Sequence, residues 1–278
     1  MDAGSEVDAA SGQALYYHRL RTPQSADRLV CAVGEHPSWM FGAEVSECGR
    51  WTVITVSEGC DPVNKVWLLD MQAPAQDPAV ASTVDAAAAS PFQLDKIIDT
   101  FEAGFDYISN DEHVFYFKTN HSAPRYRLVA IDIRRPQPEH WRELVAQHAS
   151  DVLNWVACVG SAAAAQTQLL CCHTHDVKEV LTLRPLQGAA ESSGRELSLP
   201  CPGEISGVGA RRQDTDFFFS FTSFMHPAVI FHHTLDGGAA SASAASASEV
   251  GTSTVWREVK VGSLDPKKFQ VPYCDSAR

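Results

Sequence analysis

The chain lacks two features that each define a class of protein. No apolar run reaches the roughly 18 residues that a membrane helix needs, so we expect no membrane-spanning helix. Lys and Arg number 22 against 34 Asp and Glu, which gives a formal net charge of −12. Phosphate-backbone binding needs clustered cations, and Arg134-Arg135 and Arg211-Arg212 are isolated pairs. We therefore predict neither a membrane nor a nucleic acid as a partner.

The chain also lacks a recognisable secretory signal and a disulfide framework. Residues 1–12 are acidic and rich in small side chains, with neither a basic start nor an apolar stretch, and we predict a disordered leader there. The eight cysteines are scattered, and none stands in a C-x-x-C pair. This distribution is typical of reduced thiols, so the sequence favours a cytoplasmic location.

Four pairs of predicted strands recur along the chain at near-even spacing. The first strands start at residues 52, 113, 167 and 216, which lie 61, 54 and 49 residues apart, and a second strand follows each after 12 to 14 residues. Repeats of roughly 40 to 60 residues with several strands each are typical of a β-propeller. One blade cannot bury both faces of its sheet alone, so neighbouring blades must stack.

The fold class predicted from these repeats is all-β: a partial β-propeller of about four complete four-stranded blades plus one partial blade. The partial blade contains two strands, at residues 15–20 and 28–33. The four blades that follow are expected at residues 42–71, 92–146, 152–199 and 205–261. Segments rich in Ala, Ser, Pro or Gly interrupt them at 72–91, 162–165 and 237–248, and we interpret these segments as loops.

Six motifs occur in a fixed order along nearly the whole chain. They lie at residues 15–18 (LYYH), 37–44 (PSWMFGAE), 58–67 (EGCDPVNKVW), 117–120 (FKTN) with 126–128 (YRL), 152–158 (VLNWVAC), and 221–224 (FTSF) with Pro227. In this order they resemble the propeller domain of the prolyl oligopeptidase family, collinearly from about Leu15 to Asp275.

The resemblance implies a cytosolic serine peptidase that cuts short peptides after proline. Such an enzyme has a seven-bladed propeller that excludes folded proteins, and an α/β-hydrolase domain that carries the catalytic Ser, Asp and His. On this interpretation residues 13–272 form an incomplete propeller and residues 273–278 start the hydrolase domain, the rest of which is missing here.

The chain contains no nucleophile elbow. That turn needs G-x-S-x-G, because only small residues fit beside its strained serine. The nearest match is Gly203-Glu204-Ile205-Ser206-Gly207, in which the serine comes one place late, and we interpret it as a structural turn. No Ser–His–Asp triad can be assigned within these residues, so whether the chain alone is an enzyme stays open.

Two side chains are candidates for substrate binding. Met40 and Cys60 match positions that, as the resemblance implies, face the central cavity and line the substrate pocket. Methionine suits an apolar subsite, and an exposed cysteine there would make activity sensitive to thiol reagents. Without the resemblance, both residues read as ordinary blade core. The family carries an arginine three residues before this cysteine, and the chain has Ser57 instead.

Cys171, His173 and His175 alternate, so on a strand they share one face and resemble a metal cluster. Structural zinc sites usually draw ligands from C-x-x-C turns, which the chain lacks, so hydrogen-bonded strand histidines are the preferred interpretation. His232 and His233 point to opposite faces of their strand and suit a ligand pair even less. We predict no metal and no cofactor, and a metal-dependent enzyme is the weakest alternative.

Aromatic side chains are expected between blades rather than in a ligand-binding box, because strands covered on both faces read as apolar runs. This set comprises Phe217, Phe218, Phe219, Phe221, Phe224, Trp51, Trp67 and Trp155. Asp70 and Asp132 each end a predicted strand, and we expect them to bond the backbone of the following turn.

Two functions from different classes fit these observations. In the first, the chain is the gating and substrate-filter portion of a prolyl-oligopeptidase-like serine endopeptidase. Its partners would then be short proline-containing peptides and the α/β-hydrolase domain, with the chemistry located outside these 278 residues. In the alternative, it is a non-catalytic propeller that binds proteins. An incomplete ring leaves unpaired strand edges, which favours the first function.

Overall fold

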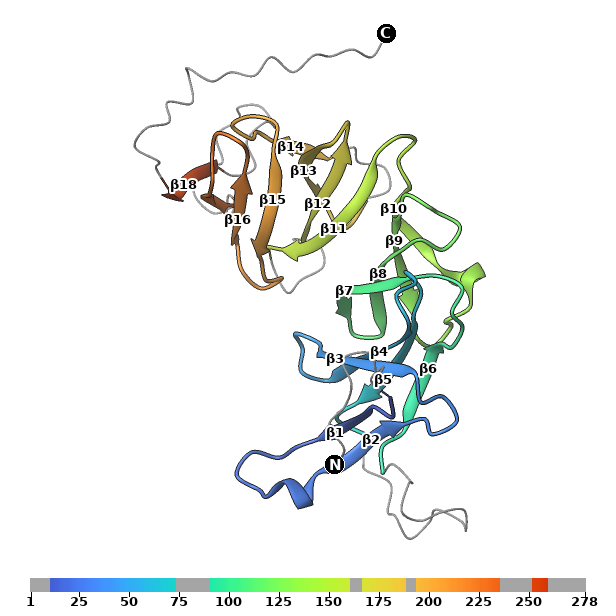
Figure 1. Ribbon diagram of the computed structural model, residues 1–278. Coiled ribbons are helices and arrows are strands. Elements are labelled where there is room, and N and C mark those ends of the chain that lie inside the picture. The colour runs from blue at the N-terminus through green and yellow to red at the C-terminus, as the bar shows by residue number, and fades with distance from the viewer. Residues whose placement is uncertain (1–10, 74–90, 161–166, 189–193, 236–251, 260–278) are drawn as a thin grey trace, which may run out of the picture. The chain divides into compact units, whose positions relative to one another are not determined.

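The described residues fold almost entirely into antiparallel β-strands. The computed structural model describes residues 11–73, 91–160, 167–188, 194–235 and 252–259. Within these, the strands form one two-stranded sheet and four four-stranded sheets, and Figure 1 shows how the strands run. The helical elements of the described residues are two 3₁₀ turns, η1 (Gln24–Ala26) and η3 (Pro138–His140). No helix among them has the length and apolar character that crossing a membrane requires.

Each sheet is a meander, so the strand order in the sheet follows the order in the chain. The two-stranded sheet pairs β1 (Ala14–Tyr17) with β2 (Arg28–Ala32). The next two sheets contain β3 (Trp39–Val45), β4 (Trp51–Glu58), β5 (Lys65–Asp70) and β6 (Leu94–Ile98), and then β7 (Phe105–Asp111), β8 (Val114–Thr119), β9 (Arg127–Asp132) and β10 (Arg142–Val145).

The last two sheets contain β11 (Val152–Val159), β12 (Gln168–His175), β13 (Lys178–Pro185) and β14 (Arg195–Leu197), and then β15 (Glu204–Gly209), β16 (Asp216–Thr222), β17 (Val229–Thr234) and β18 (Thr252–Glu258). Successive four-stranded meanders are the blades of a partial β-propeller, and the predicted fold class is confirmed.

The predicted strand pairs are the two middle strands of each four-stranded sheet, but one blade boundary was wrong. Residues 94–98 were expected to belong to the blade starting at 92. They form β6, which pairs with β5 and completes the preceding sheet. The predicted termini (1–12 and 273–278) and the loops at 72–91, 162–165 and 237–248 lie wholly or largely outside the described residues.

The chain divides into two compact units, which we describe separately. The first unit comprises residues 1–124 and 129–142, and the second comprises residues 125–128 and 143–278. The first unit therefore contains strands β1 to β8 and most of β9. The sheet β7–β10 is divided, because most of β10 belongs to the second unit. The second contains the sheets β11–β14 and β15–β18.

In the first unit, β4 is buried on both faces. Val53 and Ile54 are adjacent and point to opposite faces of the sheet, yet both are buried. Val53 joins a core cluster with Phe115 of the next sheet, whereas Ile54 joins a different cluster with Trp67 and residues of β2. Trp51 lies edge-on to Phe115, with 5.8 Å between ring centroids. Trp51 and Trp67 thus pack between sheets, as predicted.

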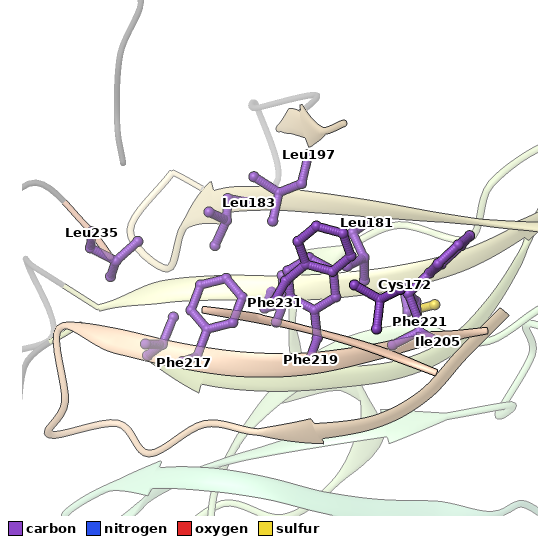
Figure 2. Packing of buried hydrophobic residues seen from close by; sticks show 13 residues of the cluster. Cys172, Leu181, Leu183, Leu197, Ile205, Phe217, Phe219, Phe221, Phe231 and Leu235 are labelled. Carbon is purple, nitrogen blue, oxygen red and sulfur yellow. The ribbon is translucent and has the colours of Figure 1, made fainter. Parts of the chain in front are cut away.

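In the second unit, three phenylalanines of β16 fill the space between the last two sheets. Phe217, Phe219 and Phe221 are each at most 1% exposed. Figure 2 shows them pointing toward Leu181 and Leu183 of the neighbouring sheet. Trp155 packs against the same cluster. The inter-blade interpretation of these aromatics is therefore confirmed.

Two phenylalanines of the predicted set do not belong to this core. Phe218 points to the opposite face of β16 and stacks on His232, with 4.5 Å between ring centroids. Phe224 is fully exposed, so its assignment to the core was wrong. It lies in the β16–β17 turn, where Ser223 and His226 exchange backbone hydrogen bonds and carry Phe224 away from the sheet.

Asp70 and Asp132 stabilise the turns that follow their strands. The Asp70 carboxylate accepts the backbone N–H of Gln72 at 2.9 Å, and Asp132 accepts that of Arg134 at 3.0 Å. Each carboxylate also pairs with an arginine, Arg50 for Asp70 and Arg134 for Asp132, both at 2.7 Å. The role predicted for both aspartates is confirmed.

Candidate functional site

Met40 and Cys60 lie at the same end of the β3–β4 hairpin. Met40 is the second residue of β3, is half-buried, and stands opposite Ser57 in the strand register. Cys60 follows the end of β4 at Glu58 and is exposed. Gly59, between Glu58 and Cys60, has φ +68°, a conformation that suits a residue without a Cβ. It turns the chain out of the strand. The hairpin therefore brings the two predicted residues to the same end of the sheet.

The segment that carries Cys60 is fixed to the next sheet by Asn64. The Asn64 side-chain oxygen accepts the backbone N–H of Phe105 at 2.6 Å, and its amide donates to the Phe105 carbonyl at 3.1 Å. The backbone N–H of Asn64 donates to the Ala103 carbonyl at 3.0 Å. Asn64 is buried, so these bonds replace the water that would otherwise satisfy the same groups.

Asn120 supplies a second attachment. Its side-chain oxygen accepts the backbone N–H of Gly104 at 2.7 Å, and its amide donates to the Pro62 carbonyl at 3.3 Å. A Cβ on Gly104 would lie 2.7 Å from that carbonyl oxygen, so glycine is required for the close approach. We call residues 59–64, held by Asn64 and Asn120, the strapped loop. Both asparagines occur in the family motifs, but sequence reasoning gave them no role.

The start of β3, next to Met40, is fixed by a stack of rings and charges. His36 stacks on Trp39, with 4.2 Å between ring centroids, and the Lys65 ammonium lies 4.5 Å from the Trp39 ring. Lys65 also bonds Asp99 at 3.1 Å. Glu58 accepts hydrogen bonds from Ser38 at 2.5 Å, which lowers the pKa of this carboxyl, and from the Trp39 indole at 3.3 Å.

This end of the hairpin presents an apolar side chain, Met40, and an exposed thiol, Cys60, beside segments that hydrogen bonds hold in place. Such an arrangement can accept an apolar group and can react with thiol reagents. Ser57 stands opposite Met40, so the position where the family has an arginine contributes no charge here. That Met40 and Cys60 line a substrate cavity stays a prediction.

Ser206 is a residue of a β-strand and not of a nucleophile elbow. It lies in β15 at a bulge between Ile205 and Gly207, and its hydroxyl is 2.8 Å from that of Ser220. The expectation of a structural role holds, but the expected turn was wrong, because the segment continues as a strand. Gly207 fits the bulge, where a Cβ would lie 3.3 Å from the Ser220 hydroxyl oxygen.

The Cys171 to His175 segment is the second part of β12. Cys171 is buried, and burial raises the pKa of its thiol to about 12, whereas His175 hydrogen-bonds Asp151 at 2.8 Å. His232 likewise pairs with Asp216 at 2.7 Å, and His233 bonds Ser253 at 2.7 Å on the other face. Across the described residues, no three His, Cys, Asp or Glu side chains gather as metal ligands.

His173 makes the stability of the second unit depend on pH. Burial lowers the pKa of His173 to about 4, aided by the nearby Arg184 guanidinium, from about 6.5 in an unfolded chain. Between these values the unfolded state binds a proton that the folded state does not, so stability falls as the pH decreases from about 6.5 to 4. After allowance for solvent screening of a partly exposed ring, we expect a loss on the order of 1–2 kcal/mol.

Urea unfolding of wild-type protein and His173→Gln at pH 7 and pH 4.5 measures this effect. The variant should lose less stability on acidification than the wild type. His175→Gln is the matched control of opposite sign, because the hydrogen bond to Asp151 raises the pKa of His175 and protonation there favours the folded state. Equal pH dependence in wild type and His173→Gln would contradict the assignment.

Comparison with known proteins identifies the family. The family described as prolyl oligopeptidase, N-terminal beta-propeller domain, matches residues 2–245. "Prolyl oligopeptidase A" of Amanita bisporigera is 26% identical over 256 residues, which are 92% of this chain and 29% of the relative. "Prolyl endopeptidase" of Elizabethkingia miricola is 23% identical over 224 residues, 81% of this chain and 28% of the relative.

Solved structures share the fold. The apo form of prolyl oligopeptidase B from Galerina marginata superimposes with a TM-score of 0.73 at 22% identity, over 92% of this chain and 32% of that one. A chain from a structural study of two prolyl endopeptidases gives 0.64 at 30% identity, over 82% and 30%. The chain thus spans about a third or less of the proteins that it matches. It belongs to the prolyl oligopeptidase N-terminal β-propeller domain family.

Proposed function

We propose that this chain is the gating and substrate-filter portion of a prolyl-oligopeptidase-like serine endopeptidase that cleaves short peptides after proline. The observation that carries the proposal is the family match over residues 2–245, together with relatives named as prolyl oligopeptidases and prolyl endopeptidases. The chain contains no G-x-S-x-G segment, so the proposal assigns the Ser, Asp and His to an α/β-hydrolase domain in other sequence. A cytoplasmic location is part of the proposal and is supported by the scattered cysteines.

In this proposal, Met40 and Cys60 form part of the wall that a peptide contacts. The half-buried Met40 supplies an apolar surface that adapts to different side chains. The strapped loop carries the exposed Cys60. Asn120 and Asn64 attach the loop to the next sheet at Pro62 and Asn64, close behind this cysteine. With Ser57 in place of an arginine, we expect selection here by shape and apolar contact rather than by charge.

The purified chain is expected to bind without catalysing. Incubation with a chromogenic peptide that carries a C-terminal proline–nitroanilide bond should release no more chromophore than buffer does. Prolyl oligopeptidase B of Galerina marginata serves as the positive control. Turnover that survives repeated purification and disappears with a serine-reactive inhibitor would overturn the assignment of the chemistry to other sequence.

A labelling experiment tests the wall itself. N-ethylmaleimide should modify Cys60, and a saturating proline-containing peptide should slow that modification while leaving Cys48, which is also exposed, at its original rate. Equal rates at Cys60 with and without peptide would remove the support for a peptide-binding role in this chain.

A further inference from the structure

Three side chains that the proposed function does not use meet at one edge of the second unit. Cys201 lies in the loop between β14 and β15, and Ser223 and His226 lie in the turn between β16 and β17. The Cys201 sulfur is 3.7 Å from Nδ1 of His226 and 3.5 Å from the Ser223 hydroxyl. Ser223 and His226 are themselves 3.2 Å apart. A thiol and an imidazole within hydrogen-bond reach of each other can act as nucleophile and base.

Ser223 positions the imidazole. Its oxygen accepts the backbone N–H groups of Met225 at 3.2 Å and His226 at 3.1 Å. These two bonds fix the turn that carries His226. Nδ1 of His226 has one lone pair, and it lies within reach of both the Ser223 hydroxyl and the Cys201 sulfur. When that lone pair is not accepting from Ser223, it can take the thiol proton of Cys201.

The sulfur is placed where a small reagent can reach it. Cys201 is half-buried, in contrast to Cys171 and Cys172, which are fully enclosed by the core. A Cβ at Gly203 would lie 2.5 Å from the Phe221 ring, so glycine lets the Cys201 loop approach the β16–β17 turn closely. Loss of the thiol proton leaves a thiolate near two donors, the Ser223 hydroxyl and the protonated His226.

We propose that Cys201 is a site of oxidation by hydrogen peroxide, with His226 as its base and Ser223 as a positioning residue. The Cys201 proton passes to Nδ1 of His226. The thiolate then attacks one peroxide oxygen, so that an S–O bond forms and the O–O bond breaks. Sulfur loses two electrons, the leaving hydroxide receives the proton from His226, and the products are one sulfenic acid and one water.

The test is peptide-resolved trapping of sulfenic acid by dimedone after the full chain is exposed to hydrogen peroxide at pH 7. Replacing His226 by glutamine should slow trapping at Cys201 about fivefold, which is the effect of one unit charge about 4 Å away in water. Ser223→Ala should slow it in the same direction. Cys48 and Cys60 are internal references, and their rates should not change in either variant.

The control variant is His140→Gln, which removes an exposed histidine of η3 and should leave the Cys201 rate unchanged. Modification at the buried Cys171 and Cys172 reports unfolding. If Cys171 of a variant reacts, the Cys201 rates of that variant and the wild type are measured at a lower temperature at which Cys171 is protected. Equal Cys201 trapping in wild type, His226→Gln and Ser223→Ala would overturn the proposal. So would an absence of trapping at Cys201 in the wild type while Cys60 is trapped.

Discussion

Replacing Phe219 with alanine is expected to lower the free energy of unfolding of the second unit by about 3–5 kcal/mol. Phe219 is 1% exposed and stacks on Phe231, with 5.0 Å between ring centroids and 16° between ring planes. Its ring fills the space between the sheets β11–β14 and β15–β18, where Leu181 and Leu183 form the facing surface. Removing the ring leaves a cavity that hydrogen-bonded sheets cannot close, so the lost contacts are not recovered.

Urea unfolding followed by circular dichroism measures this change, and peptide-resolved hydrogen exchange should locate the loss of protection in β12, β13, β16 and β17. Phe218→Ala is the matched control. It removes the same kind of side chain from the neighbouring residue, which is half-buried and lies on the opposite face of β16. Phe224→Ala should cost almost nothing, since that ring is fully exposed. A loss below about 1 kcal/mol for Phe219→Ala would mean that the two sheets are not packed as described.

Replacing Asn64 with alanine is expected to destabilise the first unit by about 2–4 kcal/mol and to release the strapped loop. The substitution leaves the N–H and the carbonyl of Phe105 without their side-chain partner in a buried place, and each such group costs about 1–3 kcal/mol. Hydrogen exchange should accelerate at Phe105 and in residues 61–64. Protection in β16 and β17 of the second unit should not change.

Two further variants separate the hydrogen bonds from the shape of the loop. Asn64→Asp keeps an oxygen that accepts the Phe105 N–H but places its second carboxylate oxygen against the Phe105 carbonyl in a buried place, so we expect a loss at least as large as for Asn64→Ala at pH 7. Gly104→Ala leaves Asn64 intact but places a Cβ 2.7 Å from the Pro62 carbonyl oxygen, which forces the loop away. If Asn64→Ala matched the wild type in both stability and exchange, the loop would not depend on this residue.

The middle strands of the sheets were predictable from the sequence, and the outer strands were much less so. The strand of Val53 and Ile54 is buried on both faces, so its residues from Trp51 to Val56 are apolar or threonine and the pattern is strong. By contrast, β14 has three residues and β6 mixes Leu94 and Ile98 with charged residues. Such short sequences show no period, and their pairing is decided by the strand beside them. This explains why β6 was assigned to the wrong blade.

The candidate site was predictable only as far as local pattern reaches. Asp70 and Asp132 act within two residues of their own position, so their role followed from the sequence. Asn64 bonds a residue 41 positions away, and Cys201 lies 25 positions from His226. Contacts at such separations depend on how two sheets stack. No local signal marked them, although the motif that contains Asn64 was noticed.

The contiguity of each sheet bears on how the protein is made. All four strands of a sheet come from one uninterrupted stretch, for example residues 152–197 for β11–β14. On the ribosome, a nascent chain can complete the backbone bonding of such a meander before the following stretch is synthesised. The apolar face of β13 must nevertheless wait for Phe217, Phe219 and Phe221, which emerge later. Co-translational folding should therefore lag by one meander, with the newest completed sheet exposed to chaperones until its neighbour arrives.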